Sequence, residues 1–194
     1  VLIKLIDAKN DLSIQVHPDD EYALKNENEF GKTEMWYIVD ADEGASLVYG
    51  FKKDVTREEY RQAIENNTLM DILNKVPVHK GDVFFIPAGM VHAIGSGILI
   101  AEIQQNSNIT YRVYDYGRVG ADGKPRELHV DKAVEVSNLK GATELDCKVK
   151  SEAKEGYAVA PLASCKYFTT ERLDIDTCAS LKVCEKSFVS LLFI

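Results

Sequence analysis

The sequence predicts a mainly β protein, folded as an antiparallel barrel or jelly roll. Seven short runs are rich in β-branched and aromatic residues and are bounded by turn residues. The spacing between them is not that of repeated βαβ units, so antiparallel pairing is expected. With 194 residues, 45% of them hydrophobic, the chain can bury a sizeable core. The runs, in order, are LIKLIDA, LSIQVH, EMWYIVDA, ASLVYGF, DVFFIPAG, ILIAEIQQ and TYRVYDY.

One segment, residues 55–76, departs from this pattern. Apolar residues recur there at helical spacing, and Thr56 with Glu59 forms a capping box at its start. We therefore predict one or two helices packed on the barrel, with a solvated charged face. The apolar positions are Tyr60, Ile64, Leu69, Ile72 and Leu73.

The pattern changes again after a helix-like segment at residues 129–139. Strand-like text resumes beyond it, so we expect one domain over residues 1–139 and an incomplete second β domain over residues 140–194. The run SFVSLLFI at residues 187–194 is expected to be a strand. Together with the first run it would present unpaired edges, so we expect the chain to be part of a longer protein and, alone, to self-associate.

Composition narrows the classes of partner. The 23 basic and 31 acidic side chains give a net charge of −8, which argues against nucleic acid or an anionic membrane as partner. No apolar run is long enough to cross a membrane and no signal peptide is evident, so a cytoplasmic location is expected. The four cysteines favour reduced thiols over a disulfide or a zinc knuckle. They are Cys147, Cys165, Cys178 and Cys184.

The stretch SIQVHPDD holds the first chemical signal. Side chains alternate between the two faces of a strand, so Gln15 and His17 share one face. Such a pair is either part of a solvated edge or two ligands directed at one ion. This stretch alone leaves both readings open.

The stretch GDVFFIPAGMVHAIG, residues 81–95, holds the second signal. Its spacing G-x5-P-x-G-x2-H, which ends at His92, resembles the second conserved box of the cupin superfamily, a metal-binding jelly roll. The first cupin box usually has His-x-His and a nearby Glu, whereas this chain has Gln15 and His17, with Glu34 much later. Ser96 also stands where that superfamily often has Asn.

These departures fit one branch of the superfamily. Residues 2–139 closely resemble the shorter bacterial form of the type I mannose-6-phosphate isomerases, and residues 140–194 resemble the start of that family's C-terminal domain more weakly. The resemblance rests on four motifs in the family's order. They are LSIQVHPDD, GKTEMWYI, GDVFFIPAGMVHAIGSG and EIQQNSNITYRVYDYGR.

The resemblance implies one zinc ion. Two imidazoles, a carboxylate and an amide oxygen form an N2O2 set that suits Zn²⁺, and with a single anion the site keeps a charge near +1. His79 and His129 lie outside the ligand motifs and are expected to be structural or exposed. The implied ligands are Gln15, His17, Glu34 and His92.

The resemblance also implies an aldose–ketose isomerase acting on mannose 6-phosphate and fructose 6-phosphate through an enediol(ate). Arg112 matches the family's active-site arginine and would stabilise negative charge. Glu102 shares a strand face with apolar residues, where a carboxylate is costly unless employed or paired. We expect Glu102 to transfer the proton, with Lys32 as the second candidate. Lys4 and Ser13, expected on strands beside Gln15, are predicted to bind the phosphate.

Two other readings stay open. His17, Glu34 and His92 are also the two-histidine, one-carboxylate set of non-haem iron dioxygenases. Gln15 as a fourth ligand and the charges of Lys32 and Arg112 argue against that class. A sugar-binding or structural cupin without catalysis is the other alternative, and it would not require Glu102 or Arg112.

Overall fold

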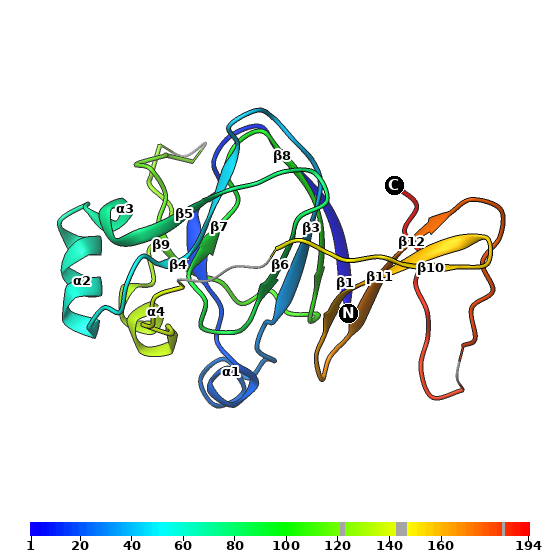
Figure 1. Ribbon diagram of the computed structural model, residues 1–194. Coiled ribbons are helices and arrows are strands. Elements are labelled where there is room, and N and C mark those ends of the chain that lie inside the picture. Colours follow the sequence, from blue (N-terminus) through cyan, green and yellow to red (C-terminus); the bar gives the residue numbers. More distant parts are fainter. Residues whose placement is uncertain (121–122, 143–146, 184) are drawn as a thin grey trace. The chain divides into compact units, whose positions relative to one another are not determined.

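The structure is a computed structural model that describes residues 1–120, 123–142, 147–183 and 185–194. The chain divides into two compact units, Val1–Cys147 and Lys148–Ile194, each of which is described by itself (Figure 1). The first unit continues beyond residue 140, where the sequence places the boundary. Ala142 donates its N–H to the carbonyl of Phe51 over 2.9 Å, and the carbonyl of Cys147 accepts from Val83 over 2.9 Å.

The first unit is a jelly roll of two facing antiparallel sheets, which confirms the predicted fold class (Figure 1). All seven predicted runs form strands in it. The four-stranded sheet has the order β1 (Leu2–Ala8), β8 (Ile98–Gln104), β3 (Glu34–Ala41), β6 (Val83–Ile86). The five-stranded sheet has the order β5 (Leu73–Pro77), β4 (Ser46–Phe51), β7 (His92–Ala93), β2 (Ile14–Val16), β9 (Tyr111–Tyr114).

Helix α2 (Arg57–Glu65) begins at the capping signal of the sequence. At the start of α2, Thr56 Oγ1 accepts the N–H of Glu59 over 3.1 Å, while the Glu59 carboxylate accepts the N–H of Thr56 over 2.7 Å, which confirms the capping box. No helix in the described part of the chain is long and apolar enough to span a membrane. The helices of the first unit are α1 (Asp20–Asn26), α2 (Arg57–Glu65), α3 (Leu69–Ile72) and α4 (Val130–Val136).

The helical prediction for residues 55–76 is wrong at its end. Helix α3 stops at Ile72, and β5 starts at the next residue and pairs with β4. Leu73 is buried, as helical spacing predicts, but its backbone is extended. Pairing with β4 supplies hydrogen bonds from a distant segment, and such long-range pairing overrides a local helical pattern.

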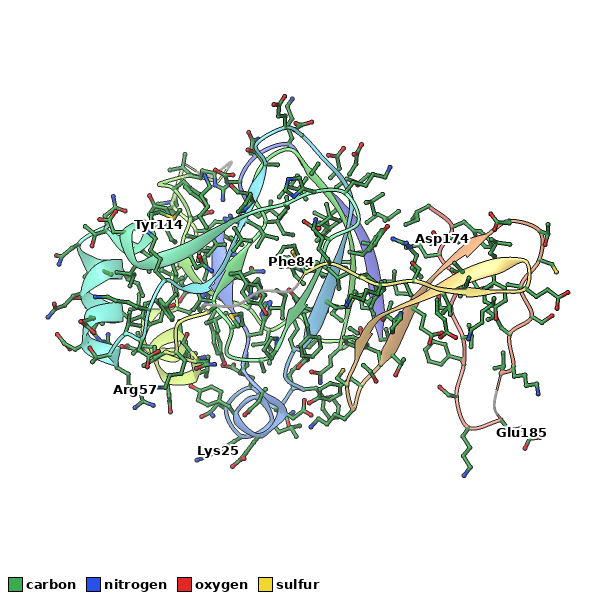
Figure 2. All side chains as sticks on the ribbon, in the orientation of Figure 1. Lys25, Arg57, Phe84, Tyr114, Asp174 and Glu185 are labelled. Atoms are coloured by element: carbon green, nitrogen blue, oxygen red, sulfur yellow. The ribbon has the colours of Figure 1, made fainter. Side chains whose placement is uncertain are left out.

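Two apolar cores lie on opposite faces of the five-stranded sheet. One core lies between the two sheets and contains Trp36, Leu47 and Phe84. The other lies between the five-stranded sheet and helices α2, α3 and α4, and contains Ile14 and Tyr60. Figure 2 shows the side chain of Phe84 in the interior of the unit, whereas the side chains on the outer faces of the helices project into solvent.

The second unit is a small antiparallel sheet in the order β10 (Glu152–Lys154), β11 (Tyr157–Ser164), β12 (Thr169–Ile175). The predicted strand at residues 187–194 is absent, because no described segment pairs with it. Its apolar side chains are exposed, Phe193 by 83%. The expected self-association stays a prediction. Cys165 and Cys178 carry free thiols, and Cys184 lies outside the described residues.

A close backbone contact joins the motif LSIQVHPDD to the motif GKTEMWYI. The N–H of Lys32 donates to the carbonyl of Pro18 over 3.0 Å, and the N–H of Gly31 donates to the Asp20 carboxylate over 3.0 Å. A Cβ added at Gly31 would lie 2.3 Å from the carbonyl carbon of Asp19. The segment that carries His17 and the segment that carries Glu34 are therefore in register only with glycine at this position.

We predict that Gly31→Ala lowers the free energy of unfolding by about 2 kcal/mol, because a methyl group forced into a packed backbone contact costs about that much. Urea unfolding of the variant and the parent protein measures this change. Leu24→Ala, at an exposed position of α1, is the matched control and should change stability by less than about 0.5 kcal/mol. Equal stability of Gly31→Ala and the parent would show that the two segments tolerate separation.

Candidate metal centre and active site

Successive side chains of β2 point to opposite faces of the five-stranded sheet, so apolar side chains pack on one face and polar side chains lie on the other. Ile14 and Val16 are fully buried in the core under the helices. Gln15 and His17 therefore point to the opposite face, toward the four-stranded sheet. The solvated-edge reading is excluded for His17, whose residue surface is 1% exposed.

The imidazoles of His17 and His92 meet a carboxylate from the facing sheet. Glu34 begins β3, and its Oε2 and Oε1 atoms lie 3.6 Å from His17 Nε2 and 3.3 Å from His92 Nε2. One ligand atom from each of the three residues lies within 4.8 Å of the other two. Glu34 and His92 are both completely buried. The structure thus brings together three of the four predicted ligands.

The other ring nitrogen of each histidine fixes its tautomer. His17 Nδ1 and His92 Nδ1 each lie 2.8 Å from a backbone carbonyl, that of Ile109 and that of Met90 respectively. A carbonyl only accepts, so both Nδ1 atoms carry the hydrogen and both Nε2 atoms present a lone pair. This is the arrangement in which backbone carbonyls orient the histidine ligands of a metal.

Three polar atoms of this cluster are buried with no hydrogen-bond partner among the described residues. They are His17 Nε2 and both carboxylate oxygens of Glu34. A buried acceptor without a hydrogen bond costs free energy. Such acceptors are therefore rare in proteins, and those that occur usually have a function. A divalent cation between these atoms would satisfy all three, so the residues present fit a metal ion.

Burial shifts the protonation equilibria of the three residues. It lowers the pKa of His92 to about 3 and the pKa of His17 well below its ordinary value, so both imidazoles are neutral at physiological pH. Burial first, and then the charge of Glu102, raises the pKa of Glu34 to about 7, although Lys32 opposes this shift. Neutral imidazoles are the ligating form, and a bound cation would favour the ionised carboxylate.

Gln15, the fourth predicted ligand, lies beside His92 on the neighbouring strand. The two residues face each other in the β2–β7 pairing, and Gln15 Nε2 lies 3.4 Å from His92 Nε2. A half-turn of the amide places Oε1 at the same position, as a ligand would require. Gln15 therefore stays a predicted ligand, adjacent to the cluster.

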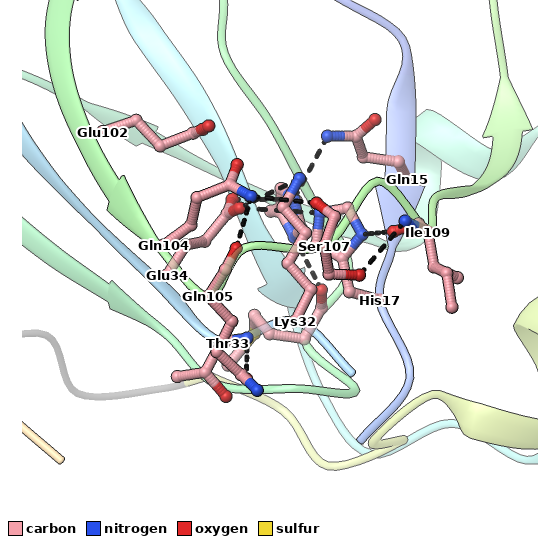
Figure 3. A network of polar contacts seen from close by, with 12 residues as sticks. Gln15, His17, Lys32, Thr33, Glu34, Glu102, Gln104, Gln105, Ser107 and Ile109 are labelled. Atoms are coloured by element: carbon pink, nitrogen blue, oxygen red, sulfur yellow. Dashed lines mark hydrogen bonds and ion pairs between the residues drawn. The ribbon is translucent and has the colours of Figure 1, made fainter. Parts of the chain in front are cut away.

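Both candidates for proton transfer are near the cluster (Figure 3). Lys32 is 5% exposed, and its Nζ lies 3.4 Å from Glu34 Oε2 as an ion pair. Glu102 is also buried, and both of its oxygens accept hydrogen bonds, one from Lys4 Nζ over 2.7 Å and one from Trp36 Nε1 over 3.0 Å. Figure 3 shows Glu102 and Gln15 extending from the two sheets toward the same space.

The predicted phosphate residues, Lys4 and Ser13, lie on or next to strands of different sheets. Lys4 is not beside Gln15, because β1 is the edge strand of the other sheet and pairs with β8. Ser13 Oγ instead accepts a hydrogen bond from Arg112 Nε over 3.3 Å, and Arg112 faces Gln15 across the β2–β9 pairing. The error arose because sequence neighbours of a strand do not reveal which sheet each strand joins.

The sequence reasoning missed Trp36. Its indole donates to Glu102, and its ring meets the ring of His92 edge-on with centroids 5.3 Å apart. The signal was present, because strand alternation in EMWYIV puts Glu34 and Trp36 on one face. The indole N–H, beside the cluster of His17, Glu34 and His92, fixes the orientation of the Glu102 carboxyl group.

Sequence comparison finds similar proteins that share one name. The chain is 46% identical over 183 residues to mannose-6-phosphate isomerase ManA of Bacillus subtilis (strain 168), which covers 94% of the chain and 58% of that protein. Over most of its own length, the chain is therefore similar to a mannose-6-phosphate isomerase. It is also 48% identical over 139 residues to the mannose-6-phosphate isomerase of Streptococcus mutans, covering 72% of the chain and 44% of that protein. No family model matches the sequence.

Structure comparison agrees with the sequence comparison. The crystal structure of a mannose 6-phosphate isomerase from Bacillus subtilis superposes with a TM-score of 0.83 at 39% identity, and the match covers 90% of this chain and 55% of that one. The chain therefore spans about half the length of the mannose-6-phosphate isomerases that it matches.

We predict that His92→Ala abolishes metal binding, because it removes one of the two predicted imidazole ligands and opens the buried cluster to water. Elemental analysis after dialysis measures the metal content of the variant and the parent. His79→Ala is the matched control, because the His79 side chain is 72% exposed and lies outside the cluster. A full equivalent of metal in His92→Ala would exclude this cluster as the binding site.

In the metal-free protein, Glu34→Gln should stabilise the fold increasingly as pH rises. The pKa of Glu34 is raised from 4.5 to about 7, so the stability given by its protonated form is complete below pH 4.5 and is lost as pH rises through 7. Glutamine at this position never ionises. The advantage should grow between pH 5 and pH 8, by on the order of 3 kcal/mol.

Urea unfolding in the presence of chelator at pH 5, 6, 7 and 8 measures this trend. Glu65→Gln, at an exposed position of α2, is the matched control and should show no comparable trend. An advantage of Glu34→Gln that shrinks toward pH 8 would contradict a raised pKa for Glu34.

Proposed function

We propose that the complete protein interconverts mannose 6-phosphate and fructose 6-phosphate with one zinc ion bound by Gln15, His17, Glu34 and His92. The observation that carries the proposal is the buried cluster of His17, Glu34 and His92, in which His17 Nε2 and both carboxylate oxygens of Glu34 have no hydrogen-bond partner among the described residues. The names of the related proteins support the choice of reaction. The N/O donor set, which contains no thiolate, supports zinc in an open, catalytic type of site.

The reaction moves a proton from C2 of the sugar to C1 through an enediol(ate). When bound, zinc supplies a Lewis acid next to the sugar oxygens. Negative charge develops on these oxygens, and a guanidinium such as that of Arg112 stabilises it while remaining fully charged. The buried ammonium of Lys32, 5% exposed, adds a second positive charge on the Glu34 side of the site.

Glu102 is our first choice for the group that moves the proton. Its two hydrogen-bond donors, Lys4 and Trp36, bind one oxygen each and hold the carboxyl group in one orientation. A general base must be ionised and within hydrogen-bond reach of the carbon that loses the proton. Lys32 is the second choice. Its position against Glu34 suits it better to orienting the sugar oxygens.

The phosphate group of the sugar requires positive charge and hydrogen-bond donors where solvent reaches the site. Lys4 uses two of its three donors, on Glu102 and Gln104, and its side chain is 36% exposed, so one donor remains for a phosphate oxygen. Ser13 has a hydroxyl that accepts from Arg112 and still carries a hydrogen to donate. Lys4 and Ser13 stay our prediction for the phosphate site. One residue would reach the phosphate from each of the two sheets.

A coupled isomerase assay on the complete protein tests the proposal. We expect turnover of mannose 6-phosphate that is lost with chelator and restored by Zn²⁺. Oxygen uptake should be absent with either metal, Zn²⁺ or Fe²⁺, which separates this function from that of an iron dioxygenase with the same two-histidine, one-carboxylate set. A zinc-loaded protein without isomerase activity would overturn the proposal.

We predict that Arg112→Ala lowers kcat by about a hundredfold with little change in KM, because the guanidinium acts on charge that develops only in the transition state. Steady-state kinetics with mannose 6-phosphate measure both constants. Arg57→Ala, at an exposed position of α2, is the matched control and should leave both unchanged. A rise in KM at unchanged kcat would show that Arg112 binds the substrate in its ground state only.

A further inference from the structure

Arg112 lies on an edge strand, so its backbone groups on the side away from β2 face no other strand among the described residues. Strand β9 ends the five-stranded sheet, and Arg112 faces Gln15 of β2. The N–H of Arg112 donates to His129 Nδ1 over 3.2 Å, and the carbonyl of Arg112 accepts the N–H of His129 over 2.8 Å. Both backbone groups therefore point away from β2, and a single residue 17 positions later satisfies both.

The side chain of His129 does not cap the helix that follows it. His129 is the N-cap of α4, where Ser, Thr, Asp or Asn normally cap the first turn, but its side chain makes no capping hydrogen bond. The imidazole is instead turned onto Arg112, beside the ring of Tyr111 at a centroid distance of 6.0 Å. The Glu127 carboxylate lies 3.9 Å from the other ring nitrogen.

The same segment also holds the guanidinium. Arg112 Nη1 donates to the carbonyl of Glu127 over 3.1 Å, while Nε donates to Ser13 Oγ. Residues 127 and 129 thus bind Arg112 through its backbone and its side chain. Helix α4 packs on β9 and β2, which anchors this segment to the sheet that carries Gln15.

We propose that His129 is a positioning residue for Arg112. Its Nδ1 and its N–H fix the backbone of Arg112 on the open edge of the sheet, and this fixes where the guanidinium lies relative to Gln15. A charge that stabilises a transition state must be held in place before the reaction, since a displacement of about 1 Å lowers the rate by up to about a hundredfold. The kinetic part of this inference rests on the proposed isomerase function.

Two substitutions of His129 distinguish the role of its hydrogen-bond acceptor, Nδ1, from the role of its imidazole ring. His129→Asn places an amide oxygen close to the position of Nδ1 and keeps the acceptor for the N–H of Arg112. His129→Ala removes the acceptor. His79→Ala deletes an imidazole whose side chain is 72% exposed and outside the site, and is the matched control.

Kinetics of the complete protein give the first test, as a double-mutant cycle with Arg112→Ala. We expect His129→Ala to lower kcat/KM by on the order of tenfold, and His129→Asn and His79→Ala by less than about threefold. In the Arg112→Ala background, His129→Ala should change kcat/KM by less than about twofold, because residues that act through one another are non-additive. An equal loss in both backgrounds, or no loss in the single variant, would overturn the inference.

Hydrogen exchange of the Arg112 side chain gives a second test that needs no activity. The ¹⁵N–¹H resonance of Arg112 Nε is assigned by its loss in Arg112→Lys. We expect exchange of this hydrogen to become at least about tenfold faster in His129→Ala and to stay unchanged in His129→Asn, because local opening controls exchange. Unchanged exchange in His129→Ala would overturn the positioning role. A wild-type protein without isomerase activity would overturn the proposed function and leave this exchange result standing.

Discussion

The structure depends on one buried electrostatic constraint, the contact of Glu34 with His17 and His92. Three acceptor atoms meet between two sheets without a hydrogen bond in the described residues, and the Lys32 ammonium forms an ion pair with one of them over 3.4 Å. Each unsatisfied buried group costs about 1–3 kcal/mol, so the cluster is destabilising unless a cation occupies it. The rest of the unit supplies the rigidity that keeps this arrangement in place.

The five-stranded sheet of the jelly roll is apolar on one face and carries the polar site residues on the other, because side chains alternate along each strand. One face of the five-stranded sheet packs on helices α2, α3 and α4 and is apolar. The other face carries a row of polar side chains across neighbouring strands, in the order Tyr49, His92, Gln15, Arg112. The cost of the polar cluster is therefore confined to one face, while the core under the helices stabilises the same strands.

The sequence predicts what is local or tied to a motif. The strand runs, the capping box of α2 and the residues that converge on Glu34 all follow from alternation, capping and the family resemblance. It fails where long-range pairing decides. Strand β5 forms at Leu73 because β4 is beside it, and Lys4 binds Glu102 because β1 pairs with β8. No spacing in one sequence reveals such neighbours.

His129 illustrates the same limit at the candidate active site. In the sequence it is an isolated histidine before a helix, for which a structural or exposed role is the ordinary expectation. Its contact with Arg112 arises only when the segment before α4 folds back over the edge of β9. A role that depends on two backbone hydrogen bonds leaves no side-chain motif for a sequence pattern to reveal.

X-ray absorption spectroscopy of the protein loaded with one equivalent of Zn²⁺ tests the central claim most directly. The account predicts a first shell of nitrogen and oxygen only, at about 2.0–2.1 Å, with the outer-shell scattering of two imidazole rings. That signature should change to one ring in His17→Ala. Sulfur scattering at about 2.3 Å, or a spectrum without imidazole, would contradict it, because the metal would then lie outside the cluster of His17, Glu34 and His92.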